Sequence, residues 1–277
     1  MALDFDGVLY EAVERKASDI HLKVGCQPLV RIDGHLERLE ELDIVSGGDL
    51  FSVVDRLADD QARIKFQQTM EMDTSYMLKD ISRFRVNVCM DDGKPRIVMR
   101  VVPLIAPQIE ELNLPPILAR MCTLRNGLVL FTGPTGSGKS TSLAAMIDRI
   151  NATRTDHIIT IEDPLEFVHN NKAGIITQRE VGQDTLNFTN ALRAALRQDP
   201  DIILIGEMRD SETVKIALSA SETGHLVLST LHTVDAVETL HRILEFFESE
   251  QQVQIRNQLA SVLRCICSQR ILPVAEG

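Results

Sequence analysis

The chain contains 277 residues, 44% of them hydrophobic and 25% charged, a composition that suits a folded globular protein and excludes a disordered one. Its length suits two ordinary domains, each with its own core. The 40 acidic and 29 basic side chains give a formal charge of −11. This charge argues against non-specific nucleic-acid binding, because phosphate recognition depends on clustered lysine and arginine.

The N-terminal sequence MALDFDGVLYEAVERK contains early acids and no long apolar core, so we expect no secretion signal. Nowhere is there an apolar run long enough to predict a membrane span, and we expect a cytoplasmic protein. Apolar residues at helical spacing predict a helix over 7–16 and an amphipathic helix over 48–66. A short strand is expected between them, at 19–24.

The pattern then changes to a period of two, which is typical of strands. Residues 83–90, RFRVNVCM, and residues 96–102, RIVMRVV, flank the turn sequence DDGKP, and we expect a hairpin. Its polar face carries Arg83, Arg85 and Arg100. A solvated hairpin face is the alternative to a functional role for these arginines.

A proline-rich stretch separates the two halves of the chain. Four prolines between residues 103 and 116 discourage regular structure. We therefore expect an N-terminal domain over 1–102, a linker over 103–116 and a second domain over 117–277. The second domain alternates short apolar runs with helical patterns, which predicts an α/β fold with a mostly parallel, doubly wound sheet. The expected strands lie at 127–133, 157–163, 201–207 and 225–230, and the expected helices at 140–151, 188–198 and 211–224.

The sequence GPTGSGKS fits the pattern G-x-x-x-x-G-K-[ST] and lies between an expected strand and an expected helix. Its glycines allow backbone N–H groups to turn toward an anion at the start of the helix. Lys139 would reach the β- and γ-phosphates of a nucleotide, and Ser140 would bind Mg²⁺. The residues expected to bind the nucleotide here are Gly133, Pro134, Thr135, Gly136, Ser137, Gly138, Lys139, Ser140 and Thr141.

Acidic residues follow two of the expected strands. Glu162, Asp163 and Glu166 lie at the end of one strand, and Glu207 ends another. The carboxyl ends of strands in an open parallel sheet border the ligand crevice, so these acids indicate a site for a metal and an attacking water. Glu207 would hold Mg²⁺ together with Ser140. For any single acid, a helix cap or a solvated turn is the alternative.

Two histidines bracket the strand in SETGHLVLSTLHT, residues 221–233. His225 and His232 could be metal ligands, an acid–base pair or caps of the strand. At ~3.3 Å per residue they lie roughly 20 Å apart, so they cannot share one metal within a chain. We expect His232 to be the one near the site and His225 to be structural or interfacial. No transition metal is expected, with Mg²⁺ as the only functional ion.

Considered together, these segments resemble the type II/type IV secretion ATPase superfamily. GPTGSGKST resembles its P-loop, TIEDPLEFVH its aspartate box, LRQDPDIILIGEMRD its Walker B segment and TGHLVLSTLHT its histidine box. KASDIHLKVG and the expected hairpin resemble the family's PAS-like domain. Within the superfamily the chain is most similar to the retraction ATPases of type IV pili.

This resemblance implies a RecA-like ATPase domain, preceded by a smaller α+β PAS-like domain, that uses ATP and Mg²⁺. Glu162 would activate the water, Lys139 would bind phosphates and Glu207 would hold the metal. His225 and His232 would sense the γ-phosphate or lie at a subunit contact. Arg83, Arg85 and Arg100 would close over the nucleotide.

The resemblance also implies partners and a location. It implies a homohexamer at the cytoplasmic face of the inner membrane, peripheral to it, that acts on the pilus platform protein, alone or with a paralogous retraction ATPase. Nucleic acid is not expected as a partner. The alternatives are a poorly hydrolysing regulatory subunit and a pilus assembly ATPase. The sequence ends at SQRILPVAEG, where family members continue through further helices, so we expect a truncated chain or a shortened paralogue.

Overall fold

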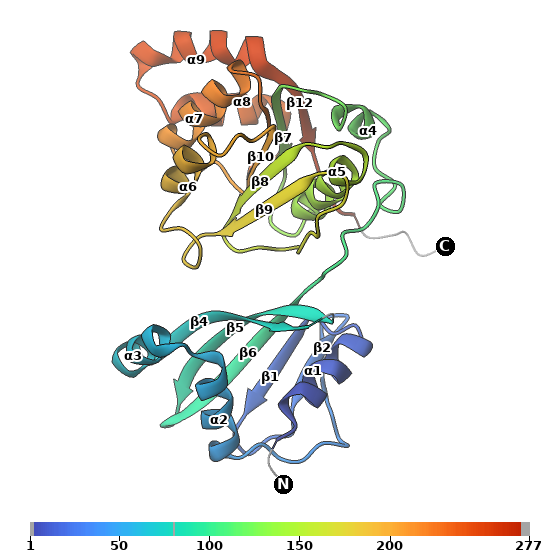
Figure 1. The fold of residues 1–277 in the computed structure, drawn as a ribbon, viewed down its shortest axis with the longest axis vertical. Coiled ribbons are helices and arrows are strands. Elements are labelled where there is room, and N and C mark those ends of the chain that lie inside the picture. The colour runs from blue at the N-terminus through green and yellow to red at the C-terminus, as the bar shows by residue number, and fades with distance from the viewer. Residues whose placement is uncertain (1–2, 80, 273–277) are drawn as a thin grey trace. The chain divides into compact units, whose positions relative to one another are not determined.

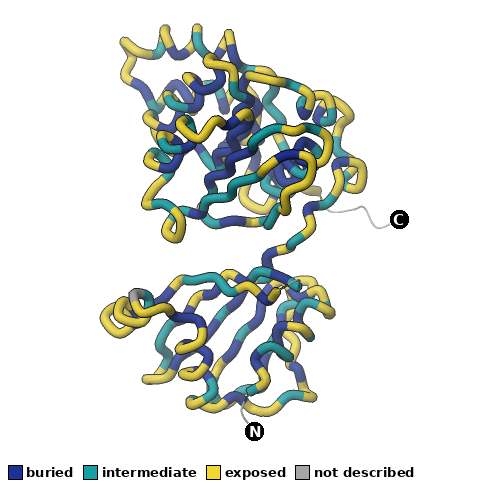
Figure 2. Tube along the Cα trace, in the orientation of Figure 1, coloured by how far each residue is buried: buried dark blue, intermediate teal, exposed yellow. Residues whose placement is uncertain are grey.

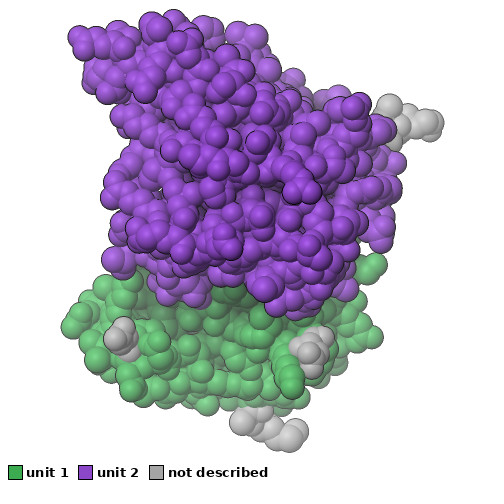
Figure 3. Space-filling model, turned by 45° about the horizontal axis from the view of Figure 1, so that its top comes forward, with its two compact units in different colours: residues 1–104 green, residues 105–277 purple. Residues whose placement is uncertain are grey.

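The computed structural model describes residues 3–79 and 81–272 and divides the chain into two compact units, residues 1–104 and 105–277 (Figure 3). The boundary lies within the proline-rich stretch. Most of that stretch belongs to the second unit, where Ala106 and Ile109 are buried. Each unit contains a six-stranded sheet and its own buried core (Figure 2).

The first unit is an antiparallel sheet with helices packed on one face (Figure 1). Its described helices are α1 (Phe5–Glu14), α2 (Gly47–Leu57) and α3 (Asp60–Thr69). Its strands are β1 (Asp19–Lys23), β2 (Leu29–Ile32), β3 (His35–Arg38), β4 (Glu71–Leu78), β5 (Ser82–Asp91) and β6 (Lys94–Val102). They pair in the order β3-β2-β1-β6-β5-β4. This is an α+β arrangement, and its PAS-like character stays a prediction.

The predicted hairpin is confirmed as β5 and β6, which pair from Arg83 with Val102 to Asp91 with Lys94. Phe84 and Val86 on its apolar face are fully buried. The prediction of a single helix over 48–66 is wrong, because the segment forms the two helices α2 and α3. Asp59 separates them, because its carboxylate accepts a hydrogen bond from the backbone N–H of Ala62 and thereby starts α3 as a separate helix.

The second unit is a parallel α/β structure. Its described helices are α4 (Ile117–Met121), α5 (Lys139–Thr153), α6 (Phe188–Ala195), α7 (Ser211–Glu222), α8 (Ala236–Glu245) and α9 (Ser249–Val262). Its strands are β7 (Gly127–Thr132), β8 (His157–Glu162), β9 (Ile175–Glu180), β10 (Ile202–Ile205), β11 (Leu226–Leu231) and β12 (Leu263–Ser268). All paired neighbours run parallel, in the order β12-β7-β11-β10-β8-β9. The predicted α/β fold is confirmed.

Helices cover both faces of this sheet. One apolar cluster joins it to α4 and α5, and another joins it to α6, α7, α8 and α9 (Figure 1). Every residue of β7, β10 and β11 is buried, which explains why their sequences are mostly apolar. Because the strands are parallel, the segments that follow β7, β8, β10 and β11 meet at one edge of the sheet. This edge carries the candidate site.

Cys265 and Cys267 lie in β12, so they share one face of a strand. All five cysteines are free thiols, and burial raises the pKa of Cys267 to about 11. Over the described residues, no helix is both long enough and apolar enough to cross a bilayer.

Candidate active site

The glycine-rich loop curls between the end of β7 and the start of α5. Gly133, Gly136 and Gly138 all have positive φ, at +143°, +79° and +86°, which glycine adopts readily. A Cβ at Gly133 would come within 2.2 Å of the carbonyl oxygen of Gln269, so the loop packs directly on the chain that leaves β12. The loop conformation therefore requires glycine for both its backbone angles and its packing.

Lys139 is the first residue of α5 and is only 7% exposed. Its Nζ donates hydrogen bonds to the carbonyl oxygens of Gly133, at 2.8 Å, and Pro134, at 2.9 Å. Burial lowers the pKa of Lys139, while the negative charges of Glu207 and Glu166 act in the opposite direction. An ammonium group held inside a loop at a helix N-terminus is suited to bind phosphate oxygens.

A cavity of about 480 Å³ opens beside the loop, a size typical of small-ligand sites. The loop itself, the loop after β8, the ends of β10 and β11, and two apolar side chains form its wall. The lining residues are Thr135, Gly136, Gly138, Lys139, Ser140, Thr141, Glu162, Asp163, Pro164, Glu166, Phe188, Gly206, Glu207, Arg209, Thr230, His232 and Ile271. Gly133, Pro134 and Ser137 shape the loop but do not line the cavity. Most of the side chains predicted from sequence thus meet in one place.

Glu162 ends β8 and borders the cavity. Burial raises the pKa of its carboxyl group to about 7, and the nearby charge of Glu166 acts in the same direction. Gly206 makes room for it, since a Cβ there would lie 3.3 Å from Cα of Glu162. A carboxylate whose pKa lies near neutrality is suited to accept a proton from water.

Glu207 follows β10 and is held by an arginine and a histidine side chain. Arg209 Nε donates to Glu207 Oε2 at 2.7 Å, and His232 Nε2 lies 3.4 Å from Glu207 Oε1. The guanidinium also approaches Asp163, with Nη1 3.7 Å from Oδ2. Arg209 therefore joins the ends of β8 and β10. The sequence analysis did not predict Arg209 as a site residue, although its position two residues after Glu207 already placed it near the cavity.

The two histidines lie at opposite ends of β11. His232 lines the cavity, as expected. His225 does not: its Nδ1 lies 2.9 Å from the carbonyl oxygen of Ala220 and 3.3 Å from Oγ1 of Thr223, at the end of α7. Within its own chain His225 is thus a structural residue, because β11 separates it from the cavity. A role at a subunit contact stays a prediction.

The three arginines predicted to close over the nucleotide lie on the polar face of the first unit's sheet. Arg85 pairs directly with Arg100 across β5 and β6. Arg100 Nε donates to Asp19 Oδ1 at 2.9 Å, and Arg83 donates to Oγ of Ser75 at 3.1 Å. They belong to a different unit from the cavity, so their action on a nucleotide stays a prediction.

The expected Mg²⁺ ligands fit the chemistry of that ion. Ser140 and Glu207 both line the cavity and supply a hydroxyl and a carboxylate oxygen, the ligand types that Mg²⁺ prefers. Over the described part of the chain, no cluster of three or more histidine, cysteine or acidic side chains forms a metal site of its own. A magnesium ion here would depend on oxygens of a bound nucleotide as well.

Comparisons with known proteins agree with this geometry. The model of the Type II/IV secretion system protein family matches residues 2–276. The type IV pilus retractation ATPase PilT of Pseudomonas aeruginosa is 43% identical over 275 residues, which cover 99% of this chain and 80% of that protein. A twitching motility protein of Neisseria gonorrhoeae is 45% identical over 252 residues, covering 91% and 67%. The crystal structure of the pilus retraction motor PilT with bound ADP superimposes with a TM-score of 0.92 at 46% identity, covering 98% and 79%.

Proposed function

The chain belongs to the Type II/IV secretion system protein family, and on this premise we propose that it is a motor ATPase that drives the retraction of type IV pili. The observation that carries the proposal is the single cavity in which the glycine-rich loop, Glu162 and Glu207 meet. The chain is similar over almost its whole length to a retraction motor with bound ADP. This similarity supports a nucleotide as the ligand and pilus retraction as the function.

The chemistry follows from the residues of the cavity. The Lys139 ammonium and the N–H groups at the start of α5 bind the β- and γ-phosphates of ATP. Ser140 and Glu207 would hold Mg²⁺, and the bound ion would neutralise charge on the phosphate oxygens. Glu162 accepts a proton from the water that attacks the γ-phosphate, and its position at the end of β8 supports this role. His232 and Arg209 orient the Glu207 carboxylate.

Conversion of hydrolysis into movement requires more than one domain. The cations expected to act with the cavity are Arg83, Arg85 and Arg100 of the first unit. We propose that these arginines close over ATP and withdraw after hydrolysis, which produces a hinge movement. Six chains would form a ring at the cytoplasmic face of the inner membrane, acting on the platform protein of the pilus, alone or with a paralogous motor ATPase.

A deletion strain tests this function most directly. Cells that lack the protein should show no twitching motility and should carry excess surface pili, whereas cells without any pili would identify an assembly ATPase instead. Sedimentation of the purified protein with Mg·ATP should give a six-chain species. A fully active monomer would contradict the ring, and a ring that binds ATP without measurable turnover would indicate a regulatory subunit.

The metal role of Glu207 makes a separate prediction. Glu207→Gln should raise the Mg²⁺ concentration needed for half-maximal hydrolysis by on the order of tenfold, because an amide oxygen carries no negative charge for the ion. Magnesium titrations of ATP turnover measure this shift, with Glu212→Gln on the surface of α7 as the control. An unchanged Mg²⁺ dependence would remove Glu207 from the metal site.

A further inference from the structure

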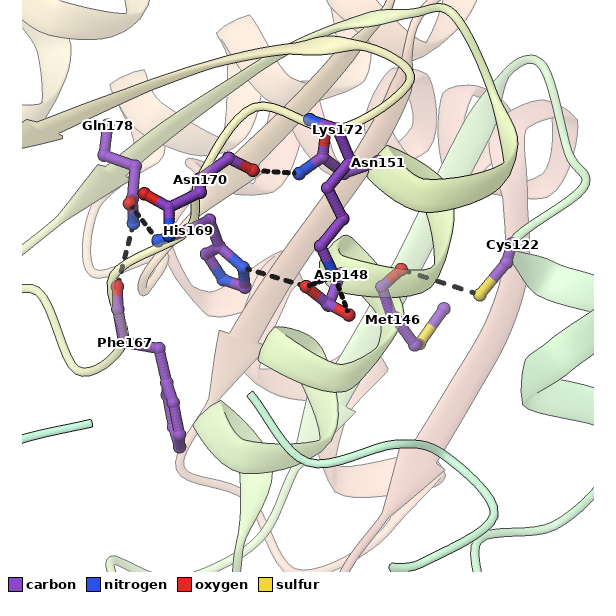
Figure 4. A network of polar contacts seen from close by, with 9 residues as sticks. All are labelled: Cys122, Met146, Asp148, Asn151, Phe167, His169, Asn170, Lys172 and Gln178. Carbon is purple, nitrogen blue, oxygen red and sulfur yellow. Dashed lines mark hydrogen bonds and ion pairs between the residues drawn. The ribbon is translucent and has the colours of Figure 1, made fainter. Parts of the chain in front are cut away.

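The segment between β8 and β9, residues 163–174, is called the acidic loop here. Asp163, Pro164 and Glu166 at its start line the cavity beside Glu162. Its remaining residues leave the cavity and run over α5 and β9, where a network of polar contacts binds them (Figure 4). Loops without such contacts are mobile, so these contacts determine how firmly the cavity wall is held.

Gln178 of β9 binds the acidic loop with both atoms of its side-chain amide. Its Oε1 accepts a hydrogen bond from the backbone N–H of His169 at 2.7 Å, and its Nε2 donates to the backbone carbonyl of Phe167 at 2.9 Å (Figure 4). Phe167 directly follows Glu166, the last cavity residue of this loop. One amide thus fixes the loop backbone at the point where it leaves the cavity.

Gln178 also lies beside the carboxylate proposed to act as the base. It pairs with Thr160 across β8 and β9, two residues before Glu162, so its side chain shares a sheet face with Glu162. The polar side chains of Thr160 and Gln178 act to lower the pKa of Glu162 and so partly offset the rise that burial causes. The Gln178 amide therefore binds the acidic loop and lies on the same face of the sheet as Glu162, the proposed base.

Asn151 binds the loop from the other side. It lies in α5, the helix that begins at Lys139, and it is fully buried. Its Nδ2 donates to the carbonyl of Asn170 at 2.7 Å, and its Oδ1 accepts from the backbone N–H of Lys172 at 3.2 Å. The loop that carries the acids is therefore joined to the helix that carries the phosphate-binding lysine.

The side chains of the network add a further attachment. Lys172 Nζ bonds both carboxylate oxygens of Asp148 in α5, at 2.6 and 2.8 Å. His169 is buried nearby, with Nδ1 4.0 Å from Asp148 Oδ1. Burial lowers the pKa of His169 to about 4, so its ring is neutral at physiological pH and fills space instead of forming an ion pair.

We propose that Gln178 and Asn151 are positioning residues for hydrolysis, which hold the acidic loop and Glu162 in register with the phosphate-binding loop. The two amides use their hydrogen bonds to hold the backbone of one loop, Gln178 from β9 and Asn151 from α5, the helix that also brings Lys139 to the cavity. This inference rests on the proposed role of Glu162 as the base. Positioning errors of about 1 Å can reduce a rate by roughly a hundredfold without removing any reacting group.

Gln178→Met tests the proposal, because methionine has a similar length and no hydrogen-bonding amide. We expect kcat for ATP to fall by on the order of tenfold or more, with KM and the Kd for ADP within about twofold of the native values. The acid limb of the kcat–pH profile should move to higher pH, because Glu162 loses a neighbouring amide that lowers its pKa and so favours its charged form.

Thr177→Val is the matched control. It removes a hydrogen bond of the same strand, between Thr177 Oγ1 and His157 Nε2 at 3.1 Å, on the face of β9 away from the acidic loop. Its kcat and pH profile should remain native. Gln178→Glu provides a second variant if the methionine protein does not fold, and its added negative charge should also move the acid limb to higher pH.

The outcomes separate the inference from the proposed function. Native kcat in Gln178→Met, with Glu162→Gln inactive, would overturn the positioning role alone. A loss of kcat with an unshifted acid limb and an equal loss in Thr177→Val would mean that Gln178 only stabilises the fold, which also overturns it. Full turnover in Glu162→Gln would overturn the assignment of the base on which the inference depends.

Discussion

Lys139→Ala is expected to abolish ATP hydrolysis, with a fall in kcat on the order of a thousandfold, and to weaken nucleotide binding. Lys139 places its ammonium inside the glycine-rich loop, where it contacts the carbonyl oxygens of Gly133 and Pro134. Phosphate oxygens would take over these contacts when ATP binds. Alanine leaves the loop backbone intact and removes the positive charge of the side chain. The expected loss of activity and affinity is therefore electrostatic and does not come from a change in the shape of the loop.

Phosphate release at saturating ATP measures the rate, and titration with ADP measures the affinity. Lys65→Ala, an exposed lysine of α3 in the first unit, is the charge-matched control and should retain native turnover. Native hydrolysis in Lys139→Ala would mean that this cavity is not where ATP is hydrolysed, since turnover would not depend on the cation of the glycine-rich loop.

Glu162→Gln should lose hydrolysis by at least about a hundredfold while still binding Mg·ATP. The amide can donate or accept a hydrogen bond with the attacking water, but it cannot take the proton. Trapping of unhydrolysed ATP on the variant, measured by filter binding, separates this effect from a binding defect. If the variant turned over normally, the role of base would pass to Glu207.

The pKa of Glu162 adds a pH dependence to this prediction. Burial raises that pKa from 4.5 to about 7, so the carboxyl group is increasingly protonated below pH 7 and hydrolysis should rise with pH through that value. Between pH 4.5 and about 7 the folded state holds this proton more tightly than the unfolded state does. The contribution of Glu162 to stability therefore declines as pH rises through this range. Glu162→Gln should consequently show a higher Tm than the native protein at pH 8, and less difference at pH 5.

The cavity could be predicted from sequence because its residues occupy fixed places in a parallel sheet. Lys139, Glu162, Glu207 and His232 each follow the carboxyl end of a strand, and parallel strands bring those ends together. The same rule placed His225 at the far end of β11. Local periodicity was therefore enough to predict which side chains meet, although the residues are far apart in the chain.

Two kinds of feature escaped prediction. The edge strands β9 and β12 are half-exposed, and their sequences IITQRE and LRCICS mix polar and apolar residues. They lack the continuous apolar run that identified the buried strands. The contacts of Gln178 and Arg209 depend on loop geometry, and a sequence pattern gives no measure of which backbone groups a side-chain amide or guanidinium will reach.

The packing of Gly133 against Gln269 has a consequence for synthesis of the protein on the ribosome. The strand that supports the glycine-rich loop is the last of the sheet to be made, and the hydroxyls of Thr132 and Ser268, 136 positions apart, are 2.9 Å from each other. The loop sequence therefore emerges early, but its final conformation waits for β12. Nascent chains stalled before Leu263 should not retain an ATP analogue, whereas the released chain of 277 residues should. Nucleotide binding would then report that the second unit has been completed, and an unfinished chain would not consume ATP.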